Sequence, residues 1–239
     1  MNDSTKIDLL GDVFELFSLN CEEEIVKNLK SCGAGIKAFL TPSLEADFSL
    51  RVYDKNNEEC REYFAAALIA AAFLTQKRGL PLSEILFEAP CGNIEVFCTG
   101  NGTFQTRIDK CKQLLSSQAE FAGCDVKYND FFIMKKIRAI HTEDITVFSK
   151  SGLSEFVMLG TEFPAAVILS SALDNRLQMH SFRDHSATFV SNLSLWCCAA
   201  LNEWITARKT IRKFQTAEYG LVLEPSEHSV TVRIDPIIF

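Results

Sequence analysis

The chain has 239 residues, of which 47% are hydrophobic and 23% charged, and its formal net charge is −7 at pH 7. This length fits one domain or two closely packed ones, and the composition is that of a globular protein with a substantial core. Lysine and arginine are scattered except around residues 208–213. We therefore expect no nucleic-acid partner, because phosphate binding needs a concentrated basic face.

The N-terminal residues lack the basic start of a secretory signal, and the longest apolar run, at 64–74, is too short for a membrane span of about 20 residues. The nine cysteines are an odd number, contain no CxxC pair and follow no regular spacing. Reduced thiols in a cytoplasmic protein, without a membrane partner, are the interpretation. The four histidines show no metal-ligand spacing, so no metal site is predicted.

The first third of the chain gives the clearest local patterns. Residues 6–19 favour strand over helix, and residues 21–35 predict a helix that stops at Gly33. Residues 47–54 alternate apolar and polar side chains as a half-buried strand does. The stretch NEECREYFAAALIAAAFL at 57–74 then predicts a buried helix that continues to about Arg78 and stops at Gly79.

The rest of the chain predicts mostly strands. Residues 85–109 contain two or three strands with turns at 90–93 and 99–102. The pattern from 111 to 144 is mixed. Strands are predicted at 144–148, 165–173 and 177–183, a helix at 193–210, and further strands from 211 to the end.

Two segments resemble each other: residues 87–109 and residues 214–235 both begin with Phe, make a hairpin and end in a strand with the letters R-I-D. Each follows an alanine-rich helix, so the chain is interpreted as two similar α/β halves. The predicted first half is residues 1–110, joined by the C-terminal strand 230–239, and the second half is residues 111–229. A cleft between two such halves is a common place for a small-molecule site.

Four stretches follow one another in a familiar order: TKIDLLGDVFELFS at 5–18, GAGIKAFLTPSLEADFSLRVYDKN at 33–56, RGLPLSEILFEAPCGNIEV at 78–96 and FPAAVILSSALDNRLQMHSFR at 163–183. This order resembles the diaminopimelate epimerase family, whose fold is that of the pyridoxal-independent amino-acid racemases and epimerases. The resemblance covers nearly the whole chain and has its best specificity over residues 34–97.

The resemblance implies an α+β fold of two pseudo-symmetric halves, each a mainly antiparallel sheet wrapped around a central helix. It implies an isomerase without cofactors, in which a thiolate takes the α-proton of an amino acid and a second thiol returns one. In the family each cysteine begins a helix in a glycine-rich motif. The helix dipole lowers the thiol pKa there, and backbone N–H groups hold the substrate carboxylate.

The first helix start departs from this pattern. Cys60 is present, but Arg61, Glu62 and Tyr63 replace the glycine-rich residues. An alignment without gaps places the catalytic position at Tyr63 or at Phe64. Cys60 is the candidate catalytic thiol only if the alignment is shifted by about three residues.

The second helix start also lacks a thiol. The window SNLSLWCC at 191–198 places the catalytic position at Asn192 or Leu193, and Ser191 lies one residue away. Cys197 matches the family's second, structural cysteine. Ser191 is thus the candidate second base, although a hydroxyl would need a strong activating neighbour.

The candidate substrate-binding residues are Asp12, Asp54, Asn192 and Arg183. Asp12 and Asp54 stand where the family has asparagine, and Arg183 with Asp184 stands where it has a Glu-Arg pair. Acidic groups in place of amides would repel a substrate carboxylate.

Three hypotheses follow. One is a racemase or epimerase that uses Cys60 with Ser191. The second is a diverged, inert relative that binds a small ligand, such as an amino acid, or a protein partner; a homodimer is left open. The third is another enzyme in the same cleft with Arg183, Asp184 and His185 as acid and base groups.

Overall fold

The computed structural model describes residues 4–31, 35–60, 62–99, 101–109, 117–121, 124–128, 132–136, 166–173, 175–183, 191–216, 220–227, 229–235 and 237. The chain divides into two compact units. The first comprises Met1–Arg107, Ser191–Ser194 and Thr231–Phe239, and the second comprises Ile108–Val190 and Leu195–Val230.

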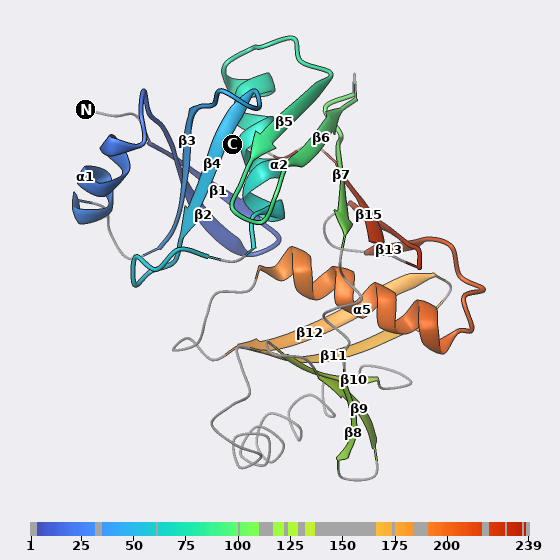
Figure 1. Cartoon of the computed structure of the whole chain (residues 1–239). Coiled ribbons are helices and arrows are strands. Elements are labelled where there is room, and N and C mark those ends of the chain that lie inside the picture. The colour runs from blue at the N-terminus through green and yellow to red at the C-terminus, as the bar shows by residue number, and fades with distance from the viewer. Residues whose placement is uncertain are drawn as a thin grey trace. The chain divides into compact units, whose positions relative to one another are not determined.

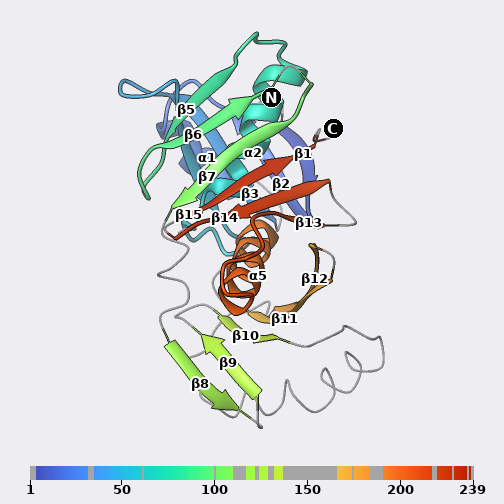
Figure 2. The ribbon, with the colours of Figure 1, turned by 90° about the vertical axis from the view of Figure 1, so that its right-hand side faces the viewer.

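The first unit contains a mixed sheet, in which the strands follow the order β1-β2-β3-β4-β5-β6-β7-β15. Its strands are β1 (Ser4–Leu9), β2 (Asp12–Ser18), β3 (Ile36–Pro42), β4 (Phe48–Tyr53), β5 (Glu84–Glu88), β6 (Ile94–Cys98), β7 (Phe104–Asp109) and β15 (Ser229–Ile234). The pairs β2-β3 and β4-β5 are parallel, and β1-β2, β3-β4, β5-β6 and β6-β7 are antiparallel. Figure 2 shows β5, β6 and β7 side by side.

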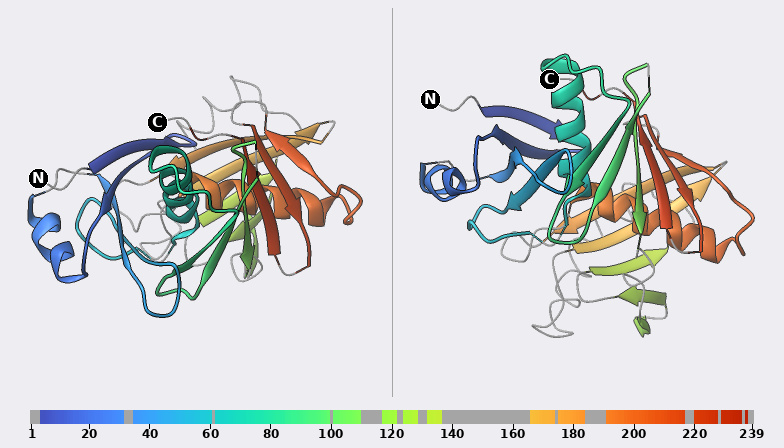
Figure 3. Two further views of the ribbon diagram at one scale, coloured as in Figure 1. Left: turned by 90° about the horizontal axis from the view of Figure 1, so that it is seen from above. Right: turned by 45° about the horizontal axis from the view of Figure 1, so that its top comes forward.

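Helix α2 (Phe64–Ala72) is the core element of the first unit. Eight of its nine residues are buried, and it contacts β1, β4 and β6 (Figure 1). Strands lie on more than one side of it when it is viewed along its axis (Figure 3). Its alanine side chains allow the surrounding strands to approach closely. A helix that is apolar all round is stable only when it is enclosed in this way.

A π-helical segment, η1 (Phe73–Lys77), continues α2 and widens its last turn. The Arg78 N–H donates to the Phe73 carbonyl, five residues back, at 3.0 Å. Gly79 follows with a φ of +67°. The predicted helix and its glycine stop are therefore confirmed, whereas nothing in the apolar pattern indicated the π-helical turn.

The loop between β4 and α2 is held by two polar side chains. Asp54 Oδ1 accepts the N–H groups of Asn56 and Glu58 at 2.8 and 2.9 Å. Lys37 on β3 is only 1% exposed, and its Nζ donates to Asn57 Oδ1 at 2.7 Å. The loop that leads into α2 is therefore anchored from inside the unit.

The helix α1 (Glu23–Ser31) lies between β2 and β3 in the chain and has an amphipathic pattern. Ile25 packs with Phe17, Leu19 and Phe39 in a small cluster. The predicted helix at 21–35 is confirmed, while its proposed stop at Gly33 lies outside the described residues.

The second unit has the strand order β14-β13-β12-β11-β10-β9-β8. These strands are β8 (Ser117–Phe121), β9 (Cys124–Tyr128), β10 (Phe132–Lys136), β11 (Ala166–Leu173), β12 (Arg176–Arg183), β13 (Phe214–Thr216) and β14 (Leu221–Pro225). The pairs β10-β11 and β12-β13 are parallel, and β8-β9, β9-β10, β11-β12 and β13-β14 are antiparallel. Helix α5 (Asn192–Thr206) has its first turn in the first unit and the rest in the second.

Most of the expected elements are found. The strands predicted at 6–19, 47–54, 85–109, 165–173, 177–183 and after 211, and the helix at 193–210, are confirmed. The strand predicted at 144–148 lies outside the described residues. Strands β3, β8, β9 and β10 were not predicted. Within the part of the chain that is described, no helix is both long enough and apolar enough to cross a membrane.

The turn between β1 and β2 generates the first prediction. Its two residues, Leu10 and Gly11, have φ values of +58° and +85°. A residue with a Cβ at position 11 would have to adopt this left-handed conformation, at a cost of about 1–2 kcal/mol. We expect Gly11→Ala to lower the free energy of unfolding by about that amount in urea titration.

Gly35→Ala is the matched control, since a Cβ at Gly35 would have no heavy atom within 4 Å and its φ is not in the left-handed range. It should leave the stability nearly unchanged. Equal losses in the two variants would contradict the role assigned to the turn.

Candidate functional site

The first turn of α5 is capped by side chains of the first unit. The Asn192 N–H donates to Asp12 Oδ2 at 2.5 Å, and Asn192 Nδ2 donates to the Leu10 carbonyl at 2.7 Å. The Ser194 N–H donates to Ser191 Oγ at 3.2 Å. N–H groups at a helix start have no partner within the helix, so these contacts satisfy them locally.

The start of α2 is capped by the chain's own glutamate. Tyr63 is the N-cap residue and makes no capping bond with its side chain. Instead, Glu62 Oε1 accepts the N–H groups of Phe64 and Ala65 at 2.9 and 3.3 Å. A carboxylate at this position also interacts favourably with the helix dipole.

Glu62 faces the capped start of α5. Its Oε2 is shielded from solvent and has no hydrogen-bond partner among the described residues. Burial raises the pKa of Glu62, and the Asp12 carboxylate raises it further. The Ser191 hydroxyl and the two helix N–H groups lower the pKa, but burial outweighs them. Asp12, Glu62, Ser191 and Asn192 thus form one cluster, called the acidic cluster below.

Cys60 does not stand at a helix start. It lies four residues ahead of Phe64, is only 4% exposed, and its N–H donates to the Val52 carbonyl at 2.8 Å. Burial raises the pKa of its thiol strongly, and the carboxylates of Asp54, Glu62 and Glu59 add to the effect. A thiol in such surroundings is protonated and unreactive at neutral pH.

Tyr63, one of the two positions given by the gap-free alignment, is only 1% exposed. Burial raises the pKa of its phenol, and the Glu59 carboxylate raises it as well. A buried neutral phenol is neither a base nor an accessible acid at this helix start.

The other predicted site residues are dispersed. The Asp54 carboxylate is used within its own loop, as described above. Arg183 ends β12 in the second unit, and Asp184 and His185 lie outside the described residues. Cys197 and Cys198 are buried within α5, past its first turn. The structure therefore brings Asp12, Ser191 and Asn192 together and adds Glu62, which the sequence did not single out as a site residue.

The residues described contain no group of three or more His, Cys, Asp or Glu side chains that could hold a metal ion.

The sequence did contain a signal for the capping role of Glu62, because a carboxylate just ahead of a long apolar run is a frequent helix-start pattern.

Comparison with known proteins gave structural matches only. No family model matches the chain, and no curated protein does. A Clostridium difficile strain 630 protein described as phenazine biosynthesis PhzC/PhzF is 16% identical, with a TM-score of 0.72 over 99% of this chain and 96% of that one. A PhzF-family phenazine biosynthesis protein of Enterococcus faecalis is 13% identical, with a TM-score of 0.69 over 97% and 94%.

A hydroxyproline epimerase from Agrobacterium vitis, solved with trans-4-hydroxy-L-proline, is 9% identical, with a TM-score of 0.59 over 97% of this chain and 89% of that one. The chain has the diaminopimelate epimerase-like fold that these proteins share. At identities this low, the TM-scores establish the fold but neither the family nor the activity.

Glu62→Gln tests the state of the acidic cluster. Burial raises the folded-state pKa of Glu62 above its ordinary value of 4.5. Below pH 4.5 the neutral side chain contributes its full stability to the folded protein, and this contribution is lost as the pH rises through the folded-state pKa. Glutamine keeps an acceptor for the helix N–H groups but cannot ionise. We expect the unfolding free energy of the wild type to fall relative to that of Glu62→Gln between pH 4 and pH 8, measured by urea titration.

Glu45→Gln, at an exposed position, is the control and should show no such divergence. A constant difference between wild type and Glu62→Gln over this range would show that Glu62 titrates normally.

Thiol labelling tests the environment of Cys60. An uncharged maleimide should modify the exposed Cys21 and Cys91 of the native protein at least about tenfold faster than the buried Cys60, because the thiolate is the reactive form. Peptide mass mapping identifies each site. Rapid labelling of native Cys60 would contradict its assignment as a buried, protonated thiol, and labelling in urea is the control for intrinsic reactivity.

Proposed function

We propose that this chain is a diverged relative of the cofactor-independent epimerases that does not perform two-thiol proton transfer and acts as a binding protein. Its ligand is a small molecule, with an amino acid as one candidate, or a partner protein. The proposal includes a cytoplasmic location and excludes a nucleic-acid partner. The observation that supports this proposal is that the starts of α2 and α5 are both capped by carboxyl groups of the chain itself.

Those caps use the groups that an amino-acid substrate would need. N–H groups at a helix start, together with the dipole, make an anion-binding site. Here Glu62 accepts two N–H groups at α2, and Asp12 accepts one at α5. A substrate carboxylate would have to displace these bonds. It would also meet the negative charge of Asp12, which is buried nearby.

The positions of the thiols support the same conclusion. The thiol ahead of α2 is buried with a raised pKa, and the thiols of α5 lie past its first turn. Proton removal from a carbon acid needs a base within hydrogen-bond reach of that proton. The racemase hypothesis with Cys60 and Ser191 therefore lacks a base in its ionised form.

The proposal includes the two-half architecture expected from the sequence. In the first unit the pairs from β1 to β6 run antiparallel, parallel, antiparallel, parallel, antiparallel. The pairs from β9 to β14 in the second unit follow the same succession. A helix comes between β4 and β5 in one unit and between β12 and β13 in the other. This correspondence supports an internal repeat.

A second candidate is an isomerase that uses carboxyl chemistry. Glu62 has one shielded oxygen and a raised pKa, and Ser191 lies beside it. A carboxyl with a raised pKa can serve as general acid or base near neutral pH. The structural neighbours named as epimerases make isomerisation the reaction class to test.

Hydrogen exchange at Cα decides between binding and catalysis. The protein is incubated in heavy water with a panel of amino acids that includes diaminopimelate, proline and trans-4-hydroxyproline. Loss of the Cα proton signal is followed by NMR. We expect no exchange above a sample without protein, because neither helix start offers an ionised thiol.

Exchange above background would overturn the proposal, and two variants would then identify the base. Loss of exchange in Cys60→Ser would assign the thiol, and loss in Glu62→Gln would assign the carboxyl. A dispersed NMR spectrum of each protein confirms that it is folded.

A further inference from the structure

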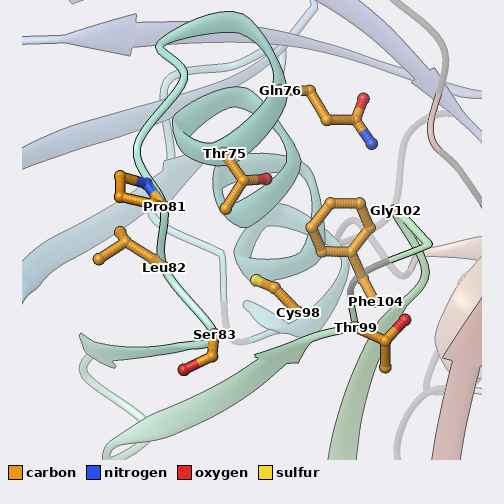
Figure 4. A pocket seen from close by; sticks show the side chains of 9 residues that line it. All are labelled: Thr75, Gln76, Pro81, Leu82, Ser83, Cys98, Thr99, Gly102 and Phe104. Atoms are coloured by element: carbon orange, nitrogen blue, oxygen red, sulfur yellow. The ribbon is translucent and has the colours of Figure 1, made fainter.

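The first unit has a pocket of about 380 Å³ at the far end of the central helix. It is lined by residues of η1, of the connection to β5, and of the β6-β7 turn: Thr75, Gln76, Pro81, Leu82, Ser83, Cys98, Thr99, Gly102 and Phe104 (Figure 4). The acidic cluster lies at the opposite end, where α2 begins at Phe64. At a rise of about 1.5 Å per residue, about 16 Å of helix separates Phe64 from Thr75.

Main-chain hydrogen bonds fix the frame of this pocket. The Cys98 N–H donates to the Ser83 carbonyl at 2.7 Å, and the Thr99 N–H donates to the Thr103 carbonyl at 2.9 Å. Gly102 closes the turn with a φ of +76°, a conformation that glycine adopts without strain. The helical wall is the π-helical turn, and such turns are frequent at functional sites. The pocket is therefore preformed.

Two polar side chains of the pocket, Thr75 and Thr99, offer acceptors, while the exposed Gln76 and Ser83 can both donate and accept. Thr75 Oγ1 donates its proton to the Ala71 carbonyl at 2.8 Å, and Thr99 Oγ1 donates its proton to the Thr103 carbonyl at 3.1 Å. Each hydroxyl oxygen then has only lone pairs left for a ligand. The end of a helix also carries partial negative charge, which favours donors and disfavours anions.

The remaining lining is uncharged or apolar. None of the nine lining residues is Asp, Glu, Lys, Arg or His. A charged ligand would lose hydration there without gaining an ionic partner. Pro81, Leu82 and Phe104 form the apolar part of the wall, which suits the faces or edges of a ring, and the volume lies within the usual range for small-molecule sites.

We propose that this pocket binds a neutral ring compound with N–H donors, of about nucleobase size. The N–H groups of such a ligand bond to the Thr75 and Thr99 oxygens, and its ring lies against Leu82 and Phe104. The site is independent of the acidic cluster, so the proposal stands whether or not the helix starts catalyse a reaction.

Two matched pairs of probes test the ligand class on the isotope-labelled full chain. Uracil and nicotinamide are neutral rings with N–H donors, whereas orotate and nicotinate carry a carboxylate on similar rings. We expect the neutral pair, at up to about 10 mM, to shift backbone amide signals of residues 75–83 and 98–104. The two anions should leave these signals unchanged.

Thr75→Val and Thr210→Val form a matched pair of variants. The two threonines make the same kind of bond, since Thr210 Oγ1 donates to the Ala207 carbonyl at 2.7 Å on an exposed surface. We expect Thr75→Val to weaken binding of the neutral probes about tenfold or more, and Thr210→Val to leave it unchanged. If Thr75→Val does not fold, Ser83→Leu at the exposed rim replaces it and should block the pocket sterically.

Four results would overturn the proposal. The first two are the absence of shifts with both neutral probes and shifts that map outside the pocket. The other two are equal affinity in the pocket and control variants, and tighter binding of the anions at the pocket residues.

Discussion

The N–H groups at the starts of α2 and α5 need acceptors, and the site depends on how the chain supplies them. The residues at both starts are partly or fully buried, and an unsatisfied buried N–H costs about as much as a lost hydrogen bond. The chain meets this need with Glu62, Asp12 and Ser191. Once these side chains are in place, an anion could bind either helix start only by displacing them.

The same requirement explains the neighbouring backbone. Asp12 follows the β1-β2 turn directly, and the Leu10 carbonyl of that turn accepts a hydrogen bond from the Asn192 side-chain amide. Two successive residues with positive φ give the tight turn that matches the twist of the paired strands. Leu10 is strained there but buried, so burial of its side chain offsets the backbone cost.

Local patterns in the sequence were sufficient to predict most helices and strands. They were not sufficient to predict which side chains meet in the acidic cluster. The apolar run at 64–74 and the alternation at 47–54 have clear periods, and both elements are found. Strand β3 was missed because Lys37 interrupts its apolar pattern, although this side chain is buried. Asp12 and Asn192 are 180 positions apart, and no local pattern could show that they touch. In the sequence Glu62 stands out only as a residue that replaces the family's glycine-rich motif, whereas its contacts make it the cap of α2.

The two ends of the α2-η1 helix differ in chemistry, and this difference limits what each can bind. At its start, Glu62 already occupies the helix N–H groups and Asp12 lies close to it, so an added anion finds no free donor there. At its end, the hydroxyl protons of Thr75 and Thr99 are committed to main-chain carbonyls, and no charged side chain lines the pocket. The same helix therefore begins at N–H groups that internal side chains already occupy and ends at an open, uncharged pocket, where the Thr75 and Thr99 oxygens favour ligands that donate hydrogen bonds.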